Sequence, residues 1–339
     1  MSQDRPVNQV VQFHVVREEG QITDVVTNSP AISHFLKLIR LTRSRNTWVS
    51  YAYDLKAFFA VVGKPLEDIT RPDCLAFMEQ QDRAGRSRAT VNRRLAAVSS
   101  LFTELHLLDP DRFPANPVHP VRRRHQRDAG QSLYRRQPQR IPDVVAPEDL
   151  RTFLAALPTW RDRTLVLLLW ISCLRISEAV AIRFQDIECS HRRVTIIASK
   201  GGDVRTVYMD PTTFAALNRY LDLERRDLFP EQEAVFIAFK GRSRGRPLSV
   251  NAFQKLISYY AKKCALVDLH AHLFRHTGIT QLVEQGMAEP AIRQFVGHHR
   301  PESLLPYLHL ADSYVETEFA RAQGALEPAN FLSSEGGHA

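Results

Sequence analysis

Apolar residues recur with helical spacing through the first third of the chain. In the segment before Gly63 they stand at i, i+4, i+7, i+8 and i+11, as Tyr51, Leu55, Phe58, Phe59 and Val62. A second stripe of helical spacing is formed by Val91, Leu95, Val98, Phe102 and Leu105. Such spacing puts apolar side chains on one face of a helix, and a glycine commonly ends one. The pattern predicts a small helical domain over residues 30–118.

Helix start signals mark the beginning of this domain. Ser29 precedes Pro30, and Thr70 is followed by Pro72 and Asp73. A hydroxyl N-cap with proline in the first turn is typical of a helix start. In front of these helices, the apolar runs VVQFHVV and QITDVVT flank REEGQ. We therefore expect a short β-hairpin within the N-terminal extension, residues 1–29, with a frayed terminus as the alternative.

The periodicity stops between residues 110 and 143, where proline and arginine are frequent. The arginines of this segment are Arg122, Arg123, Arg124, Arg127, Arg135, Arg136 and Arg140. We interpret residues 119–143 as a basic linker. A linker that only had to be flexible could use Gly and Ser, so the repeated arginine indicates that it lies along a polyanion. A solvated linker is the alternative.

The rest of the sequence predicts a second domain over residues 144–325, followed by a tail at 326–339. Its most apolar stretch, TLVLLLWISCL (164–174), fits a buried helix. Residues 192–210 alternate on both sides of KGGD, which is typical of a β-hairpin. From residue 212 onward we expect helices, apart from the loop KGRSRGRPLS. The predicted fold class is mainly α, with a small antiparallel β-sheet in a mixed but mostly helical second domain.

Composition narrows the class of protein. The 339 residues carry a formal net charge of +8, and 44% are hydrophobic, a balance typical of a globular chain. The excess positive charge suits a nucleic-acid-binding protein, although a solvated basic surface has the same composition. No apolar run approaches the about 18 residues of a membrane-spanning helix, and the N-terminus lacks the features of a secretory signal. Because the cysteines are scattered without a CxxC pair, we expect reduced thiols, no metal site and a cytoplasmic protein.

Four short segments of the second domain hold polar groups that can support chemistry. They contain Arg175 with Glu178, Lys200, His272 with Arg275, and His298 with Tyr307. Each has an ordinary explanation by itself, such as a pair within one helix, a solvated lysine in a turn, or histidines that bind a metal. His272 and Arg275 are spaced i, i+3 and therefore share a helix face. The metal-site alternative is weak because only Asp268 lies nearby to complete a ligand set.

Taken together and in this order, these residues resemble the tyrosine recombinase (phage integrase) family, whose pattern is R…K…HxxR…[H/W]…Y. The segment CLRISEAVAIRFQDI is similar to the family's GLRxSELxxLxxxDI, and SKGGDVRTVYM to its GKGxKxRxVPL hairpin. HLFRHTGITQLVEQG resembles HxLRHTxATxLxxxG, and VGHHRPESLLPYLHL resembles LGHxSxxxTxxYxHV. Residues 30–118 are similar to the helical (SAM-like) core-binding domain of this family. The short N-terminal extension favours a two-domain enzyme of the Xer-like or transposon-encoded type.

The resemblance implies a site-specific DNA recombinase that acts on a scissile phosphate. Arg175 and Arg275 would grip this phosphate, because a guanidinium can bind two non-bridging oxygens at once. His298 would donate a further hydrogen bond, and Lys200 would protonate the departing 5′-oxygen. Glu178 would orient Arg175. These cationic donors would take the place of a metal ion.

The same resemblance makes Tyr307 the nucleophile, which would form a 3′-phosphotyrosyl intermediate and free a 5′-hydroxyl. A tyrosine hydroxyl with a pKa of about 10 is neutral at pH 7 and must lose its proton during the attack. His272 is the expected proton acceptor, whereas His276 is expected to be structural. No cofactor or ATP is implied, because the phosphotyrosyl bond conserves the energy needed for religation.

The chain departs from the family pattern at four positions. Phe274 stands where the family usually has Leu, Gly278 where it has a larger apolar residue, and Val296 where Leu is common. Pro306 directly precedes Tyr307 and is expected to stiffen the segment that carries it. None of these changes removes a catalytic group, so we expect an active enzyme.

The expected partner is double-stranded DNA at a specific recombination site, enclosed by both domains. Most contacts should go to phosphates, from Arg86, Arg88, Arg93, Arg94, Arg122, Arg123, Arg124 and Arg205. By resemblance, a homotetramer would assemble on two DNA sites, with accessory proteins in some systems and no membrane. A helix after Tyr307 would dock on a neighbouring copy or pack on its own domain. The DNA-bound enzyme would be associated with the bacterial nucleoid.

Two other classes of protein share part of these features. A type IB topoisomerase uses similar residues to nick and close DNA, but the helical domain at 30–118 argues against it. A DNA-binding protein without catalysis would not need all six polar groups. Integration, excision, resolution and inversion are all compatible with the sequence.

Overall fold

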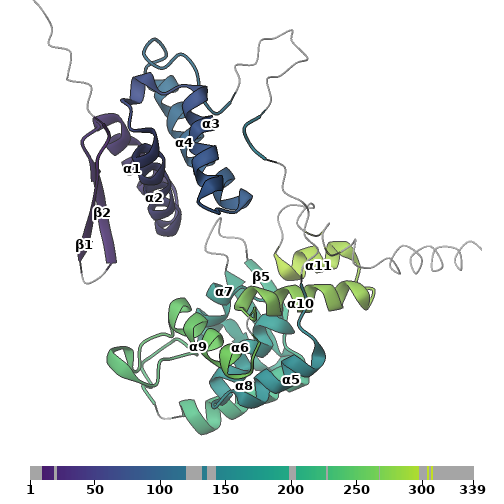
Figure 1. Cartoon of the computed structure of the whole chain (residues 1–339). Helices are drawn as coiled ribbons and strands as arrows, with labels where there is room; N and C mark the ends of the chain where they lie inside the picture. The colour runs from purple at the N-terminus through teal and green to yellow at the C-terminus, as the bar shows by residue number, and fades with distance from the viewer. Residues whose placement is uncertain are drawn as a thin grey trace, which may run out of the picture. The chain divides into compact units, whose positions relative to one another are not determined.

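The computed structural model describes residues 10–18, 21–119, 132–135, 143–197, 204–226, 228–266, 268–297, 304 and 307. The chain divides into two compact units, residues 1–138 and 139–339, which carry the purple-to-blue and teal-to-yellow colours of Figure 1. Each unit has a buried apolar core of its own. The boundary between them falls within the predicted basic linker.

The first unit consists of a β-hairpin and four helices. Strands β1 (Phe13–Glu18) and β2 (Gln21–Thr27) pair in antiparallel orientation, as the sequence predicted. The helices are α1 (Pro30–Thr42), α2 (Arg45–Val62), α3 (Arg71–Arg83) and α4 (Arg88–Leu108). Ser29 caps α1 through its side chain, and Gly63 ends α2 with a φ of 59°. The predicted start of α1 and the predicted end of α2 are confirmed.

The predicted apolar stripes form the core of this unit. Leu55, Phe58 and Phe59 of α2 are buried, as is every residue of the predicted stripe on α4. The hairpin lies against α1 and adds Val25 to the same core, with Val11 just before it. The N-terminal extension is therefore part of the folded unit from residue 10 onward.

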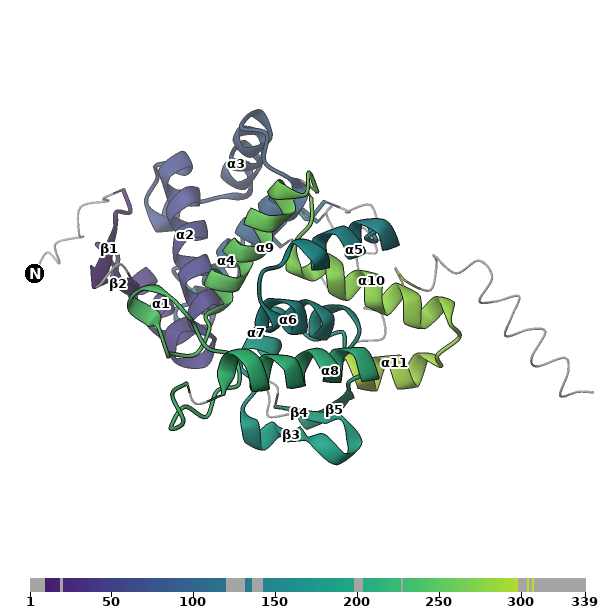
Figure 2. The same cartoon turned by 90° about the horizontal axis from the view of Figure 1, so that it is seen from below.

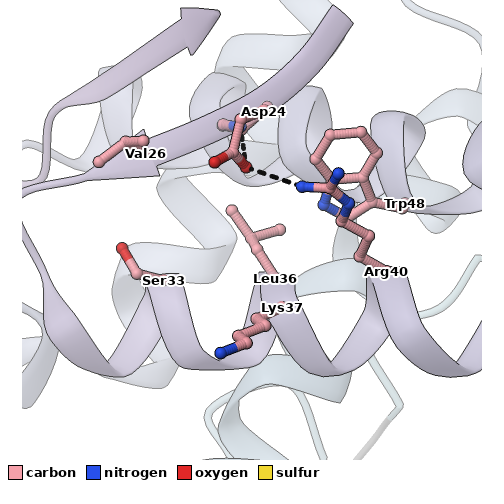
Figure 3. Close-up of a pocket in the computed structure, with 8 residues that line it drawn as sticks. Asp24, Val26, Ser33, Leu36, Lys37, Arg40 and Trp48 are labelled. Carbon is pink, nitrogen blue, oxygen red and sulfur yellow. Dashed lines mark hydrogen bonds and ion pairs between the residues drawn. The ribbon is translucent and has the colours of Figure 1, made fainter.

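A pocket marks the junction between the hairpin and the helices (Figure 3). Arg40 of α1 lies 3.4 Å from a carboxylate oxygen of Asp24 on β2. The same guanidinium is 5.2 Å from the ring centre of Trp48 on α2. An ion pair and a cation–π contact therefore add to the apolar packing that joins β2, α1 and α2.

Part of the predicted linker packs on the first unit. Leu133 is buried in the core of that unit, and the backbone N–H of Arg135 donates to Asn92 Oδ1 at 3.1 Å. The Arg135 guanidinium donates to Asp82 at 2.6 Å. At least this linker arginine has a protein partner. The arginines predicted to bind DNA from the linker lie outside the described residues: Arg122, Arg123 and Arg124.

The second unit is a helical domain with one small sheet. Its helices are α5 (Pro147–Ala156), α6 (Trp160–Trp170), α7 (Ile176–Val180), α8 (Pro211–Tyr220), α9 (Val250–Lys263), α10 (Ala271–Glu284) and α11 (Glu289–Val296). Strands β3 (Ile187–Glu188), β4 (Arg193–Ile197) and β5 (Val204–Tyr208) form an antiparallel sheet in that order. The predicted hairpin is β4–β5, and the mainly helical fold class is confirmed.

The prediction of continuous helices after residue 212 was wrong for one stretch. Helix α8 runs into a π-helical turn at Leu221–Arg225, and no α-helix follows among the described residues until α9. Val235 and Phe236 are fully buried here, and Tyr220 donates its hydroxyl to the Val235 carbonyl at 2.8 Å. The run Ala234–Ile237 is buried at every position in a bent, non-helical segment, so it has no helical period for the sequence to show.

Helix α6 lies at the centre of this unit, between α8 and α10 (Figure 2). Gly278 of α10 makes the close crossing possible, since a Cβ at this position would lie 1.9 Å from the Trp170 carbonyl oxygen. Phe274 fills the core, with its ring 5.3 Å from that of Phe153. Packing against α6 and α5 thus accounts for two departures from the family pattern. Within the described residues, no helix is both long and apolar enough to cross a membrane.

Candidate active site

The turn between α6 and α7 prepares the position of the predicted catalytic Arg175. Cys173, two residues earlier, is fully buried and has a φ of 50°. This left-handed conformation is the one that glycine adopts at least cost, and the family pattern has Gly at this place. The Cys173 carbonyl accepts a hydrogen bond from Arg275 Nη1. Burial raises the pKa of the Cys173 thiol to about 12, so the thiol stays protonated and unreactive.

Arg175 caps α7 and pairs with Glu178 on the same turn. The Arg175 backbone N–H donates to Glu178 Oε2, and Arg175 Nη1 donates to Oε1, both at 2.9 Å. The Arg175 side chain is 38% exposed, whereas that of Glu178 is 9% exposed. The carboxylate is therefore fixed in the protein while part of the guanidinium reaches solvent. These contacts support the prediction that Glu178 orients Arg175.

Glu178 has a second cationic partner, Arg205 of β5. Arg205 Nη2 and Nη1 donate to the two carboxylate oxygens at 2.7 and 3.0 Å, and both side chains are 9% exposed. Burial alone would raise the pKa of Glu178, but hydrogen bonds and charge from Arg205, followed by Arg175, lower it to about 2. Glu178 is thus ionised at every physiological pH.

The DNA contact predicted for Arg205 is therefore corrected. Arg205 stands opposite Ile196 in the β4–β5 register, and Ile196 is buried. Side chains alternate across a strand, so Arg205 faces the interior while Val204 and Thr206 are exposed. A single arginine in a short strand gives no sign of which face it occupies, and the sequence therefore favoured the usual exposed position.

The last carbonyl groups of α11 each accept a hydrogen bond from a different arginine. The pairs are Arg205 Nε to Phe295 O at 3.0 Å, Arg275 Nη2 to Val296 O at 2.9 Å, and Arg175 Nη2 to Gly297 O at 3.1 Å. Carbonyls in the last turn of a helix lack intrahelical donors and carry negative partial charge. The end of α11 therefore fixes the three guanidinium groups relative to one another.

Arg275 is the most enclosed of these three arginines. Its side chain is 6% exposed, and its Nη1 lies 4.0 Å from Glu178 Oε2. Burial, followed by the charge of Arg175, lowers the pKa of Arg275 to about 10. The guanidinium nevertheless stays charged at neutral pH. Three arginines around one carboxylate leave an excess of positive charge, which suits an anion.

Tyr307 is buried in a small apolar cluster of the second unit. It is 4% exposed and shares the cluster with Cys173 and Val296, whose carbonyls bind Arg275. Burial raises the pKa of Tyr307 to about 12, although Arg275 acts in the opposite direction. The hydroxyl forms a hydrogen bond with His276 Nδ1, and the two rings stack at 5.6 Å between centroids and 29° between planes.

The expected partner of this hydroxyl, His272, lies one turn earlier on α10. Burial, followed by His270 and the two active-site arginines, lowers the pKa of His272, so its imidazole is neutral at pH 7. The structure instead pairs the hydroxyl with His276, which was expected to be only structural. Residues four apart share a helix face, so the spacing placed both histidines beside the site and could not rank them.

Two of the six predicted catalytic residues, Lys200 and His298, lie outside the described residues. The other four, Arg175, Arg275, His272 and Tyr307, come from the α6–α7 turn, α10 and the segment after α11. These segments are far apart in the sequence. The hydrogen bond between Arg275 and the Cys173 carbonyl, for example, joins residues 102 positions apart. The tertiary fold thus brings these four residues into the same unit.

The arginines of the first unit differ in how they are placed. Arg86 and Arg88 are exposed next to and at the start of α4. Arg93 donates to the buried Asp54 and keeps 51% of its side chain exposed. Arg94 is only 18% exposed and lies 3.8 Å from the same carboxylate. This placement does not support a groove contact by Arg94.

Two family models match the chain. Residues 143–313 match the model described as the phage integrase family, and residues 32–107 match the phage integrase N-terminal SAM-like domain. The hairpin at residues 13–27 lies in front of both matches.

Relatives with similar sequences include recombinases and a transposase. The chain is 28% identical over 309 residues to the tyrosine recombinase XerC of Roseiflexus castenholzii, covering 86% of this chain and 92% of that protein. It is 25% identical over 324 residues to transposase B from transposon Tn554 of Staphylococcus aureus, covering 88% of this chain and 48% of the transposase. The chain thus spans about half the length of that transposase.

Solved structures share the fold. One is the XerH site-specific recombinase bound to palindromic difH substrate, with a TM-score of 0.64 and 19% identity over 85% of this chain and 82% of that one. Another is the Tn1549 transposon integrase in complex with a circular intermediate DNA, with a TM-score of 0.65 and 18% identity over 86% and 99%. Both likenesses show that the two-domain architecture is the same.

Proposed function

The chain belongs to the phage integrase family of tyrosine recombinases, which break and rejoin DNA, and we propose that it recombines specific DNA sites with Tyr307 as its nucleophile. One observation carries this proposal. Arg175 and Arg275 meet around Glu178 in the unit that also holds Tyr307. A pair of fixed guanidiniums beside a tyrosine hydroxyl suits attack on a phosphodiester.

The two arginines stabilise the charge that develops on the phosphate. Attack on phosphorus places extra negative charge on the non-bridging oxygens, and fixed cationic donors lower the energy of that state. Arg175 is exposed enough to meet the substrate, and Arg275 lies enclosed beside it. Because both are already bonded to Glu178 or to the end of α11, little reorganisation is needed. We assign the further phosphate hydrogen bond to His298.

The covalent step exchanges one phosphoester bond for another. The Tyr307 oxygen bonds to phosphorus, the bond from phosphorus to the 5′-oxygen breaks, and the 3′-phosphate stays on the tyrosine. We assign protonation of the 5′-oxygen to Lys200. Attack by a 5′-hydroxyl of another strand reverses the step and religates the DNA, so no external energy source is required.

A covalent adduct assay tests this proposal. Duplexes bound by the protein are first selected from a random pool, and the selected site is then made with a nick next to the scissile position. We expect an adduct that survives denaturant in the presence of a chelator and that is absent in Tyr307→Phe. A wild-type protein that forms no adduct on its selected site would refute the proposal.

The same substrates separate recombination from topoisomerase action. A recombinase exchanges strands between two duplexes that carry the selected site, whereas a type IB topoisomerase relaxes a supercoiled plasmid without exchange. The match of residues 32–107 to the SAM-like domain of phage integrases favours recombination. Relaxation without any recombinant product would support the topoisomerase alternative.

DNA contacts by the first unit and the linker should be mainly to phosphates. We assign them to Arg86, Arg88 and Arg93, together with the linker arginines Arg122, Arg123 and Arg124. Each neutralised phosphate releases counterions, so an increase from about 50 to 200 mM salt should weaken binding by about 10³-fold or more for six or more contacts. Affinity that stays level over this range would contradict the assignment.

The assembly and location of the enzyme are proposed from the family. Strand exchange between two sites needs four active sites, one for each strand, so we propose a homotetramer on two duplexes. Accessory proteins would set the direction of the reaction. The enzyme would act in the cytoplasm, on the DNA of the nucleoid.

A further inference from the structure

The hydroxyl of Tyr307 has one hydrogen-bond partner among the described residues, and it is none of the six predicted catalytic residues. His276 Nδ1 bonds the hydroxyl, and the imidazole also stacks on the phenol ring. Two different contacts therefore join the same two side chains. Tyr307 is 4% exposed, so the described protein presents the hydroxyl to His276 and not to bulk water.

His276 is also tied to the phosphate-binding arginines. It directly follows Arg275 on α10, and Arg275 is anchored on the carbonyls of Cys173 and Val296. Those two residues belong to the apolar cluster that surrounds Tyr307. One turn of α10 thus holds both Arg275, a hydrogen-bond donor to the phosphate, and His276, the partner of the nucleophile. Their positions are fixed relative to each other, as general-base catalysis requires.

We propose that His276 is a catalytic residue that holds the Tyr307 hydroxyl and accepts its proton. This inference rests on the function proposed above. As the bond from the Tyr307 oxygen to phosphorus forms, the O–H bond breaks and an N–H bond forms at His276 Nδ1. The bond from phosphorus to the 5′-oxygen breaks at the same time, and that oxygen takes its proton from the acid assigned above, Lys200.

The surroundings of His276 keep it able to accept a proton. Burial lowers the pKa of its imidazole, and the neighbouring His272, Arg275 and His270 lower it further, whereas Asp143 acts in the opposite direction. The imidazole is therefore neutral at pH 7, and the proposed role requires the tautomer in which Nδ1 is unprotonated and the hydroxyl donates. Below the lowered pKa, a protonated Nδ1 cannot accept, so cleavage should fall on the acid side.

Three substitutions separate the proposed role from packing. His276→Phe keeps an aromatic ring against Tyr307 and removes the acceptor. His276→Asn keeps a hydrogen-bonding group near the place of Nδ1, without a group that titrates. His276→Gln extends its amide toward the place of Nε2 instead. The matched control is His191→Phe, because His191 is 58% exposed in the same unit.

The experiment measures the rate of adduct formation on the nicked site between pH 5 and 8, together with DNA affinity and thermal unfolding. We expect His276→Phe to slow cleavage by about 10²-fold or more, with DNA affinity unchanged. His276→Asn should be faster than His276→Gln and should lack the acid-side fall of the wild type. If His276→Phe does not fold, the pH profile of His276→Asn decides.

Two results would overturn the inference. One is cleavage by His276→Phe within threefold of the wild type and of His191→Phe. The other is an acid-side fall that persists in His276→Asn and disappears in His272→Asn, which would make His272 the acceptor. Both require that the wild type forms the adduct and Tyr307→Phe does not, so failure of the proposed function gives a different result.

Discussion

Replacing Arg205 with methionine should destabilise the second unit by about 3 kcal/mol. Methionine matches the aliphatic part of the arginine side chain and keeps apolar packing in β5, so the change removes mainly the guanidinium. Glu178 then loses the bidentate partner that binds both carboxylate oxygens, and the Phe295 carbonyl loses its donor. A buried carboxylate without that partner carries most of the cost of having left water.

The magnitude follows from the pKa of Glu178. Its partners lower this pKa from 4.5 to about 2 in spite of burial, and each pKa unit corresponds to about 1.4 kcal/mol. After the opposing cost of burial is included, the protein therefore favours the ionised form by about 3 kcal/mol, with Arg205 as the largest favourable contributor. Both side chains are 9% exposed, so solvent screening reduces the value little.

Urea unfolding followed by tryptophan fluorescence measures this effect. Trp48 lies in the first unit, so a Trp48→Phe background leaves Trp160 and Trp170 to report on the second unit alone. The matched control is Arg151→Met. Its ion pair with Glu148 is more than 70% exposed on both sides, and its loss should cost less than about 0.5 kcal/mol.

A double mutant completes the test. Arg205→Met combined with Glu178→Met should be less unstable than the sum of the two single changes, since no charge is left buried. The reasoning fails if Arg205→Met unfolds at the same urea concentration as Arg151→Met, or if the two changes are additive.

Three further predictions concern the same region. Glu178 has a folded pKa below its ordinary 4.5, so its stabilisation is present above pH 4.5 and is lost as the pH falls toward 2; urea midpoints should drop over this window in the wild type and much less in Glu178→Gln. Gly278→Ala should lower the free energy of unfolding by about 3 kcal/mol, because the added Cβ would meet the Trp170 carbonyl oxygen. The control Gly85→Ala has nothing within 4 Å of the added Cβ and should cost only the about 1 kcal/mol of a left-handed residue. Equal costs in calorimetry would contradict the close crossing of α6 and α10. Cys173→Gly should be more stable than Cys173→Ala by about 1 kcal/mol, because only glycine relieves the positive φ, and the opposite order would show that the turn is unstrained.

Local periodicity was enough to predict most of the helices. Ser29 marks the start of α1 and Gly63 marks the end of α2. Both could be predicted because capping and left-handed geometry depend on only a few neighbouring residues. The prediction failed around Val235 and Phe236, where the chain is non-helical and fully buried. Burial on both sides removes the alternation that sequence patterns depend on.

The sequence by itself determined the residue types and the order of the motifs. These are the two arginines Arg175 and Arg275, the histidines beside Arg275, and Tyr307, all carried on a helical fold. Only the tertiary structure decided which groups meet. It turned Arg205 inward onto Glu178 and brought His276 to the Tyr307 hydroxyl. Residue type and spacing limit which helix or strand face a side chain occupies, whereas contacts between residues 27 to 122 positions apart depend on how the helices and strands pack.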